Sequence, residues 1–239
     1  LPGRMAGRMA VTTGTAAIHA RTHRLIASRY PTVGVFDDLV APEDARAAME
    51  LESLTNDRLT GALGRLDAIP RADWAVDAPG ASLAMAAFLH PAPGGGRFNA
   101  AELGAWYAAC ELETAIGETL YHHTRRLKAS AAGFPATIQM RELLSTPKAD
   151  LHDLRGRQAE AAELFEPDLA SYAASQSFGE TLRRAGADGI VFDSVRRAGG
   201  CNIVLYKPRL AVPVTQGDHY RYAWDAAGRA QVDRLTSVA

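Results

Sequence analysis

Apolar side chains recur at helical spacing between residues 111 and 128. Leu112, Ile116, Leu120 and Leu127 fall on one side of the predicted helix, and Glu111, Thr114, Glu118, His122 and Arg125 fall roughly on the other. Glu118 and His122 are four residues apart, so their side chains are neighbours on one face. Periodicity alone favours an ordinary solvated face that carries an incidental Glu/His pair.

Short apolar or alternating segments predict strands in other parts of the chain. They are residues 22–26, 104–109, 137–143, 189–193 and 202–207, and the alternating aromatic residues of 220–224 precede a turn and predict a C-terminal hairpin. The segment 104–109 is small and aromatic and therefore predicts a buried strand. We interpret residues 147–153 as a connection.

Two further helical patterns complete the predicted fold. A leucine stripe follows a proline and acidic residues from residue 42 to residue 69, and residues 168–184 form a pattern that ends before Gly186. No linker or repeat divides the 239 residues, so we expect an α+β fold: one compact domain of mixed or antiparallel sheets flanked by helices. Residues 1–15 lack periodicity, and we expect a disordered leader before a domain spanning residues 16–239.

Composition limits the classes of partner and compartment. The 26 basic and 27 acidic residues nearly cancel, so an anionic ligand requires a local basic site, and direct binding to nucleic acid is not expected. The two cysteines form neither a disulfide framework nor a zinc-binding spacing, so we expect no metal. No apolar run is long enough to span a membrane, and the N-terminus lacks the core of a signal peptide. A cytoplasmic protein is the expectation.

A glycine-rich loop supplies the first candidate for binding chemistry. Gly94, Gly95 and Gly96 permit close approach of a ligand to the backbone, and they are followed by Arg97, so the loop is a candidate anion site. The glycines do not continue as G-x-G-x-x-G into a helix with an acidic residue about twenty positions later. A Rossmann dinucleotide site is therefore not expected.

Two separate blocks of the sequence resemble the RES domain, the toxin half of a bacterial RES–Xre toxin–antitoxin family. The first is GGRFNAAELGAWYAACELETAIGETLYHH at residues 95–123, with an arginine in a glycine loop, a Tyr-Ala-Ala strand and a helix carrying glutamate. The second covers residues 189–208, with a strand, a serine loop and a strand that ends in proline. Two ordered blocks are more specific than either motif alone.

The resemblance implies a fold similar to bacterial ADP-ribosyltransferase toxins and NAD⁺ as substrate. Cleavage of the nicotinamide–ribose bond develops positive charge on the ribose, so Glu118 is the candidate for the central carboxylate. Arg97 would contact phosphate through its planar fork. Tyr107 would stack on nicotinamide or its ribose, and Ser194 would bind nicotinamide or orient Glu118. His122 would orient Glu118 or accept a proton.

Two arginines near the first strand are secondary candidates. RES proteins open with a similar arginine-containing strand, so Arg24 and Arg29 could contact phosphate, although arginines at strand ends are more often surface ion-pair residues. The resemblance also implies a cognate antitoxin with a helix-turn-helix domain that blocks the active site. DNA contact would belong chiefly to that antitoxin.

Several alternatives remain open from the sequence. ADP-ribose could pass to a host protein, which the helical region before the motif favours slightly, or to water or phosphate, which would make the protein an NAD⁺ glycohydrolase or phosphorylase. A serine hydrolase using Ser194 and His122 would lack the G-x-S-x-G elbow. A non-catalytic module that only binds the antitoxin is the alternative from another class.

Overall fold

The computed structural model describes residues 13–29, 36–37, 46–47, 49–50 and 57–236. Within these residues, nine strands form one sheet in the order β1-β5-β6-β7-β3-β2-β4-β8-β9. The strands are β1 (Thr15–His19), β2 (Thr22–Ala27), β3 (Trp106–Ala109), β4 (Ala136–Ser145), β5 (Lys148–Asp153), β6 (Gly189–Asp193), β7 (Cys201–Leu205), β8 (Val214–Trp224) and β9 (Ala230–Leu235). The pair β5–β6 is parallel and the other pairs are antiparallel, so the sheet is mixed.

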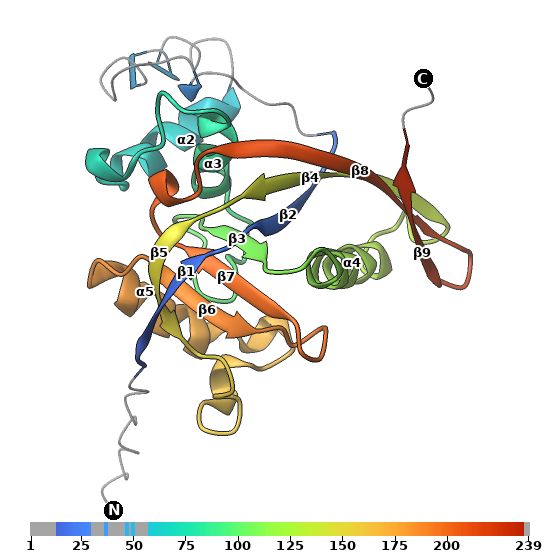
Figure 1. Cartoon of the computed structure of the whole chain (residues 1–239). Coiled ribbons are helices and arrows are strands. Elements are labelled where there is room, and N and C mark those ends of the chain that lie inside the picture. The colour runs from blue at the N-terminus through green and yellow to red at the C-terminus, as the bar shows by residue number, and fades with distance from the viewer. Residues whose placement is uncertain (1–12, 30–35, 38–45, 48, 51–56, 237–239) are drawn as a thin grey trace, which may run out of the picture.

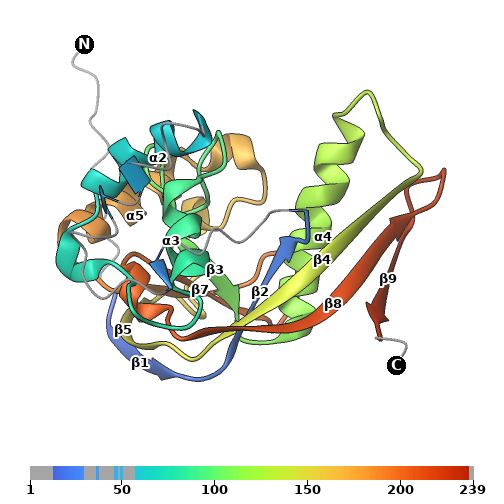
Figure 2. The ribbon, with the colours of Figure 1, turned by 90° about the horizontal axis from the view of Figure 1, so that it is seen from above.

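Helices flank this sheet. The α-helices among the described residues include α2 (Asp57–Asp67), α3 (Ala81–Leu89), α4 (Leu112–Lys128) and α5 (Ala173–Arg184). Short 3-10 helices occupy Arg71–Asp73, Ala162–Leu164, Leu169–Ser171 and Pro208–Leu210. The first part of β4 and the last part of β8 run beside α4, away from α2 and α5, whereas the start of β8 packs against α3 (Figures 1 and 2). The expected α+β class, with a mixed sheet flanked by helices, is confirmed.

The apolar side of α4 packs where its periodicity predicts. Leu112, Ile116, Leu120 and Leu127 contact a core cluster that includes Met140, Tyr220, Tyr222 and Trp224 on β4 and β8. Two hydrogen bonds add to this packing, from Trp224 Nε1 to Thr124 Oγ1 at 2.8 Å and between the Thr119 and Tyr222 hydroxyls at 2.9 Å. The helix is thereby held on β4 and β8, with Glu118 on its other side.

The predicted strands 22–26, 104–109, 137–143, 189–193 and 202–207 are confirmed, as is the C-terminal hairpin. The expected connection at 147–153 is wrong, because those residues include strand β5. Its alternation of buried Ala149 and Leu151 with exposed Lys148 and Asp150 is a strand pattern that the charges obscure. The helical pattern at 168–184 begins as a 3-10 turn, and α5 starts at Ala173.

The N-terminal boundary of the ordered domain differs from the expectation. Strand β1 starts at Thr15 and pairs with β5, so the last residues assigned to a leader belong to the sheet edge. Gly14 O accepts a hydrogen bond from Asp153 N at 2.9 Å, and Thr13 Oγ1 lies 2.6 Å from His152 Nδ1. Residues 1–12 lie outside the described residues. So does most of the first half of the helical pattern predicted from residue 42 to residue 69, namely residues 42–45, 48 and 51–56. Among the described helices, none combines the length and apolarity needed to cross a membrane.

Candidate functional site

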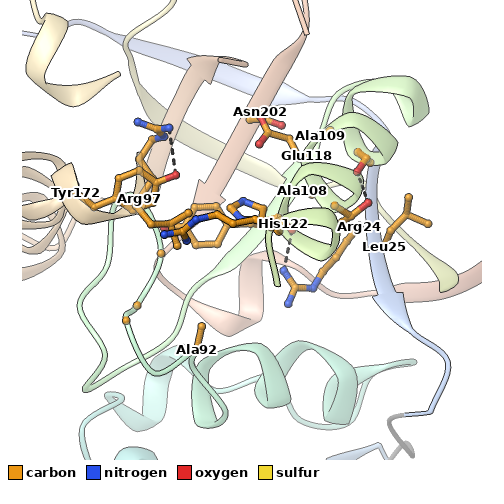
Figure 3. Close-up of a pocket in the computed structure, with 18 of the residues that line it drawn as sticks. Arg24, Leu25, Ala92, Arg97, Ala108, Ala109, Glu118, His122, Tyr172 and Asn202 are labelled. Carbon is orange, nitrogen blue, oxygen red and sulfur yellow. Dashed lines mark hydrogen bonds between the residues drawn. The ribbon is translucent and has the colours of Figure 1, made fainter. Parts of the chain in front are cut away.

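A cavity of about 600 Å³ opens between the glycine loop, strand β3 and helix α4. Figure 3 shows Arg24, Arg97, Glu118, His122 and Asn202 around it. The basic lining residues are Arg24, Arg97, Arg125 and Arg126, with His23 and His122, whereas Glu118 is the single carboxylate among the described lining residues. The nearly neutral chain therefore has the local basic site that an anionic ligand requires.

Two neutral donors hold the Glu118 carboxylate. Ser194 Oγ donates to Glu118 Oε1 at 2.7 Å, and Asn202 Nδ2 donates to the same oxygen at 2.8 Å. Ser194 lies just after β6 and Asn202 lies in β7, so two adjacent strands fix a side chain of α4. Both contacts fall on Oε1, which leaves Oε2 available on a carboxylate that lines the cavity.

Ser194 positions Glu118 from outside the cavity lining. Its backbone N–H donates to Gly200 O at 2.8 Å, and its hydroxyl accepts hydrogen bonds from the N–H groups of Arg196 and Arg197, both at 3.1 Å. The residue thus closes a turn and also orients the carboxylate. Because the hydroxyl donates to Glu118 and not to a histidine, this geometry does not support the serine hydrolase alternative.

The Tyr107 hydroxyl holds the glycine loop. It accepts from Phe98 N at 2.9 Å and donates to Asn99 Oδ1 at 2.8 Å. A Cβ atom on Gly96 would lie 2.7 Å from this hydroxyl, so the close approach requires glycine there. Burial raises the pKa of Tyr107 well above its usual value, so the hydroxyl stays protonated. The ring lines the cavity, while the polar end is already bonded within the protein.

Arg97 ties the glycine loop to the segment around Tyr172. Its Nη1 donates to Leu164 O and Glu166 O, both at 2.9 Å, and its Nη2 donates to Tyr172 Oη at 3.2 Å. The guanidinium carbon lies 4.5 Å from the centroid of the Tyr172 ring, a cation–π geometry. Burial lowers the pKa of Arg97. Arg97 lines the cavity as expected, but some of its guanidinium N–H donors already bind groups of the protein itself.

The structure separates the two secondary arginine candidates. Arg24 lines the cavity, donates from Nη1 to Tyr107 O at 2.9 Å and lies 5.0 Å from the Trp106 ring centroid. Burial lowers its pKa to about 10, so it remains charged at neutral pH. Arg29 is exposed beyond the end of β2 and does not line the cavity. Of the two phosphate candidates, Arg24 therefore lies with the other site residues and Arg29 does not.

His122 joins Glu118 in the cavity, as the helical spacing predicts. Burial lowers the pKa of His122, although the nearby Glu118 carboxylate opposes that change. The imidazole is therefore neutral at neutral pH and can accept a proton. Its ring meets that of Tyr121 edge to face at 5.4 Å.

Sequence reasoning missed three kinds of cavity residue. Asn202 is a buried polar residue in an otherwise apolar strand, and a polar residue at such a position could have identified it as a candidate site residue. Arg126, in the last turn of α4 beside Arg125, also lines the cavity, but no motif marks it. Tyr172 reaches the site from a segment for which the sequence offers no such signal. In the described residues, no cluster of three or more His, Cys, Asp or Glu could hold a metal.

Comparison with known proteins identifies a similar protein, a similar solved structure and a matching family. An uncharacterized protein, y4oC, of Sinorhizobium fredii (strain NGR234) is 28% identical over 220 residues, which cover 87% of this chain and 85% of that protein. A crystal structure of the M. tuberculosis MbcT–MbcA toxin–antitoxin complex contains a chain that aligns at 14% identity and a TM-score of 0.42, over 92% of this chain and 87% of that chain. The RES domain family model matches residues 65–225, most of the sequence and both motif blocks. The chain therefore belongs to the RES domain family.

Proposed function

We propose that this protein is the toxin of a toxin–antitoxin pair and that it cleaves the nicotinamide–ribose bond of NAD⁺, passing ADP-ribose to a host protein. The observation that carries the proposal is the Glu118 carboxylate, fixed by Ser194 and Asn202 inside a cavity that four arginines line. A dinucleotide with two phosphates matches that charge, and 600 Å³ lies within the usual range for ligand pockets. Membership of the RES domain family supports the toxin assignment.

The proposed chemistry uses Glu118 at the ribose. As the bond to nicotinamide breaks, its electron pair leaves with the nicotinamide nitrogen and positive charge develops at the ribose C1′. A carboxylate held in advance in a partly buried site stabilises that charge without reorganising during the reaction. Because Ser194 and Asn202 occupy Oε1, Oε2 is the atom that would face the ribose or its hydroxyls.

The basic and aromatic lining would position the rest of NAD⁺. Arg24 and the donors of Arg97 that remain would contact the pyrophosphate, since guanidinium groups bind phosphate oxygens with directed, charge-assisted bonds. The Tyr107 ring would stack on nicotinamide or its ribose without offering its hydroxyl, which holds the glycine loop. His122, neutral at neutral pH, would accept the proton that the attacking nucleophile loses.

The proposed partner is a cognate antitoxin, with a helix-turn-helix domain and a surface that covers the cavity. We place the pair in the cytoplasm, where NAD⁺ and host proteins are both available. We propose no direct nucleic-acid binding by this chain, because 26 basic and 27 acidic residues leave its overall charge near zero.

One experiment tests the reaction and identifies the acceptor. Purified protein is incubated with NAD⁺ labelled on the adenylate side, with and without host lysate, and free nicotinamide, soluble products and label on protein are measured. We expect nicotinamide release with label on one lysate protein. Release with soluble ADP-ribose or its phosphate ester only would replace transfer by hydrolysis or phosphorolysis. NAD⁺ binding by folded, antitoxin-free protein without release would refute the enzyme and favour a binding module.

A further inference from the structure

Cys110 and Cys201 lie opposite each other on neighbouring strands. The pairing of β3 with β7 places Ala109 opposite Asn202, and the next residues outward are Cys110 and Cys201. Cys110 N donates to Cys201 O at 2.9 Å, so the ladder continues through this pair. Strands β3 and β7 run side by side in Figure 1. Two residues 91 positions apart in the sequence are thus brought into register.

Both thiols point to the same face of the sheet. Cys110 and Cys201 pack against the core cluster that contains α2 and α3, whereas Asn202 reaches Glu118 on α4 at the opposite face. Opposed residues in a hydrogen-bonded antiparallel pair have Cα atoms about 5.5 Å apart, within the roughly 4.4–6.8 Å that disulfides span. The backbone register therefore suits a covalent link.

The two thiols are adjacent and influence each other's ionisation. Their interaction lowers the pKa of Cys110 and raises that of Cys201, whose Sγ also lies 3.9 Å from Asn202 O. Cys110 is therefore the first to ionise, and the thiolate is the species that attacks a disulfide. Both residues are only partly buried, so a small oxidant can reach them. These features differ from those of an inert, fully buried cysteine.

We propose that Cys110 and Cys201 form a reversible disulfide when small-molecule disulfides such as oxidised glutathione accumulate, and that this bond disturbs the Asn202–Glu118 contact. The Cys110 thiolate attacks one sulfur of the small disulfide and releases one thiolate. Cys201, deprotonated, then attacks Cys110 Sγ and releases the second. Two protein thiols and one small disulfide thus give one protein disulfide and two small thiols, with both protons passing to the released thiolates.

The link to the site is direct along the backbone. Cys201 precedes Asn202, whose side chain donates to Glu118 Oε1 at 2.8 Å. Cys201 N also donates to Glu111 Oε2 at 3.2 Å, and Glu111 caps the start of α4. The Cα separation already suits the bond, but a disulfide also fixes the Cβ–S–S–Cβ dihedral at about ±90°, a torsion that two free thiols need not hold, so bond formation twists these two strand ends. The start of α4 and Asn202 move with them.

The disulfide itself is tested on the wild-type protein. The full chain is incubated in buffers of reduced and oxidised glutathione, alkylated, digested without reduction and analysed by mass spectrometry. We expect a Cys110–Cys201 cross-linked peptide pair, two hydrogen atoms lighter than the reduced pair, that disappears with dithiothreitol. Separate glutathione adducts, disulfide-linked dimers or unmodified thiols at the most oxidising ratio would overturn the proposal.

The coupling to the site has two readouts. The effect on turnover rests on the proposed function. The oxidised protein should release nicotinamide at least about tenfold more slowly than the reduced protein. In Cys110→Ala and Cys201→Ala, the rate of release should be the same in both redox buffers. Hydrogen exchange is independent of activity and should rise on oxidation in β7 and the first turn of α4. If reduced protein releases no nicotinamide, the proposed function fails and exchange alone decides the coupling. Unchanged exchange with a formed disulfide would refute the coupling.

Discussion

Replacing Asn202 by alanine tests how much the site depends on the anchoring of Glu118. The Asn202 side chain donates one 2.8 Å hydrogen bond to the carboxylate and is 6% exposed, so no solvent donor replaces it easily. A hydrogen bond to a charged group contributes about 1.5–3 kcal/mol. At about 1.4 kcal/mol for each tenfold change in rate, kcat/KM for nicotinamide release should fall about 10- to 100-fold.

The assay compares four proteins by steady-state nicotinamide release: the wild type, Asn202→Ala, Glu118→Ala and the double variant. Because Asn202 acts through Glu118, its substitution should change kcat/KM less than about twofold once Glu118 is alanine. Thr124→Val is the matched control, since it removes another 2.8 Å side-chain hydrogen bond on α4 outside the cavity lining. Additive losses, or an Asn202→Ala variant within twofold of the wild type, would refute the anchoring role.

Three further predictions concern the loop, a histidine and Arg97. Gly96→Ala should lower the free energy of unfolding by about 1–3 kcal/mol, because the new Cβ meets the Tyr107 hydroxyl at 2.7 Å. Gly94→Ala has open space at its Cβ and should match the wild type in urea titrations. Equal losses in the two variants would contradict the role of Gly96. Burial lowers the pKa of His123 to about 4 from 6.5, so between those pH values the unfolded chain binds the extra proton and stability falls as pH falls. Because the His123 ring is partly exposed, solvent screening reduces the effect, and we expect the free energy of unfolding to fall by about 1 kcal/mol from pH 7 to pH 5. His123→Gln should remove this pH dependence. A variant with the same pH slope as the wild type would show that His123 is not its source. Arg97→Lys should lower the free energy of unfolding by about 2 kcal/mol and should also weaken NAD⁺ binding measured by calorimetry. The reason is that an ammonium group cannot replace the guanidinium that binds two backbone carbonyls. Wild-type values for both quantities would contradict the role of Arg97.

The elements with strong local patterns could be predicted from the sequence. The four-residue apolar spacing in α4 fixed which side is buried, and therefore that Glu118 and His122 share the other side. Residues 104–109 and 189–193 are short and apolar, and both proved to contain buried strands. Strand β5 was missed because Lys148 and Asp150 alternate with only two buried side chains. Local patterning thus succeeds where burial is continuous and fails at a charged strand.

The detailed site depends on contacts that no local pattern contains. Asn202 reaches Glu118 across 84 residues, and Arg97 reaches Tyr172 across 75. These contacts follow from strand order and register, which tertiary packing decides. Tyr107 was expected to stack on nicotinamide or its ribose, and nothing in its local sequence indicated that its hydroxyl holds the glycine loop. The types of residue at the site could therefore be predicted, but their bonding could not.

The most direct test of the account compares nicotinamide release by the wild type and by Glu118→Gln. Glutamine keeps the shape of the side chain and can still accept from Ser194 and Asn202, but it removes the negative charge. Loss of a preorganised charge typically costs about 100- to 1,000-fold in kcat. We expect such a loss with NAD⁺ binding and the urea midpoint close to those of the wild type. Turnover within about twofold of the wild type would contradict the central role of the Glu118 carboxylate.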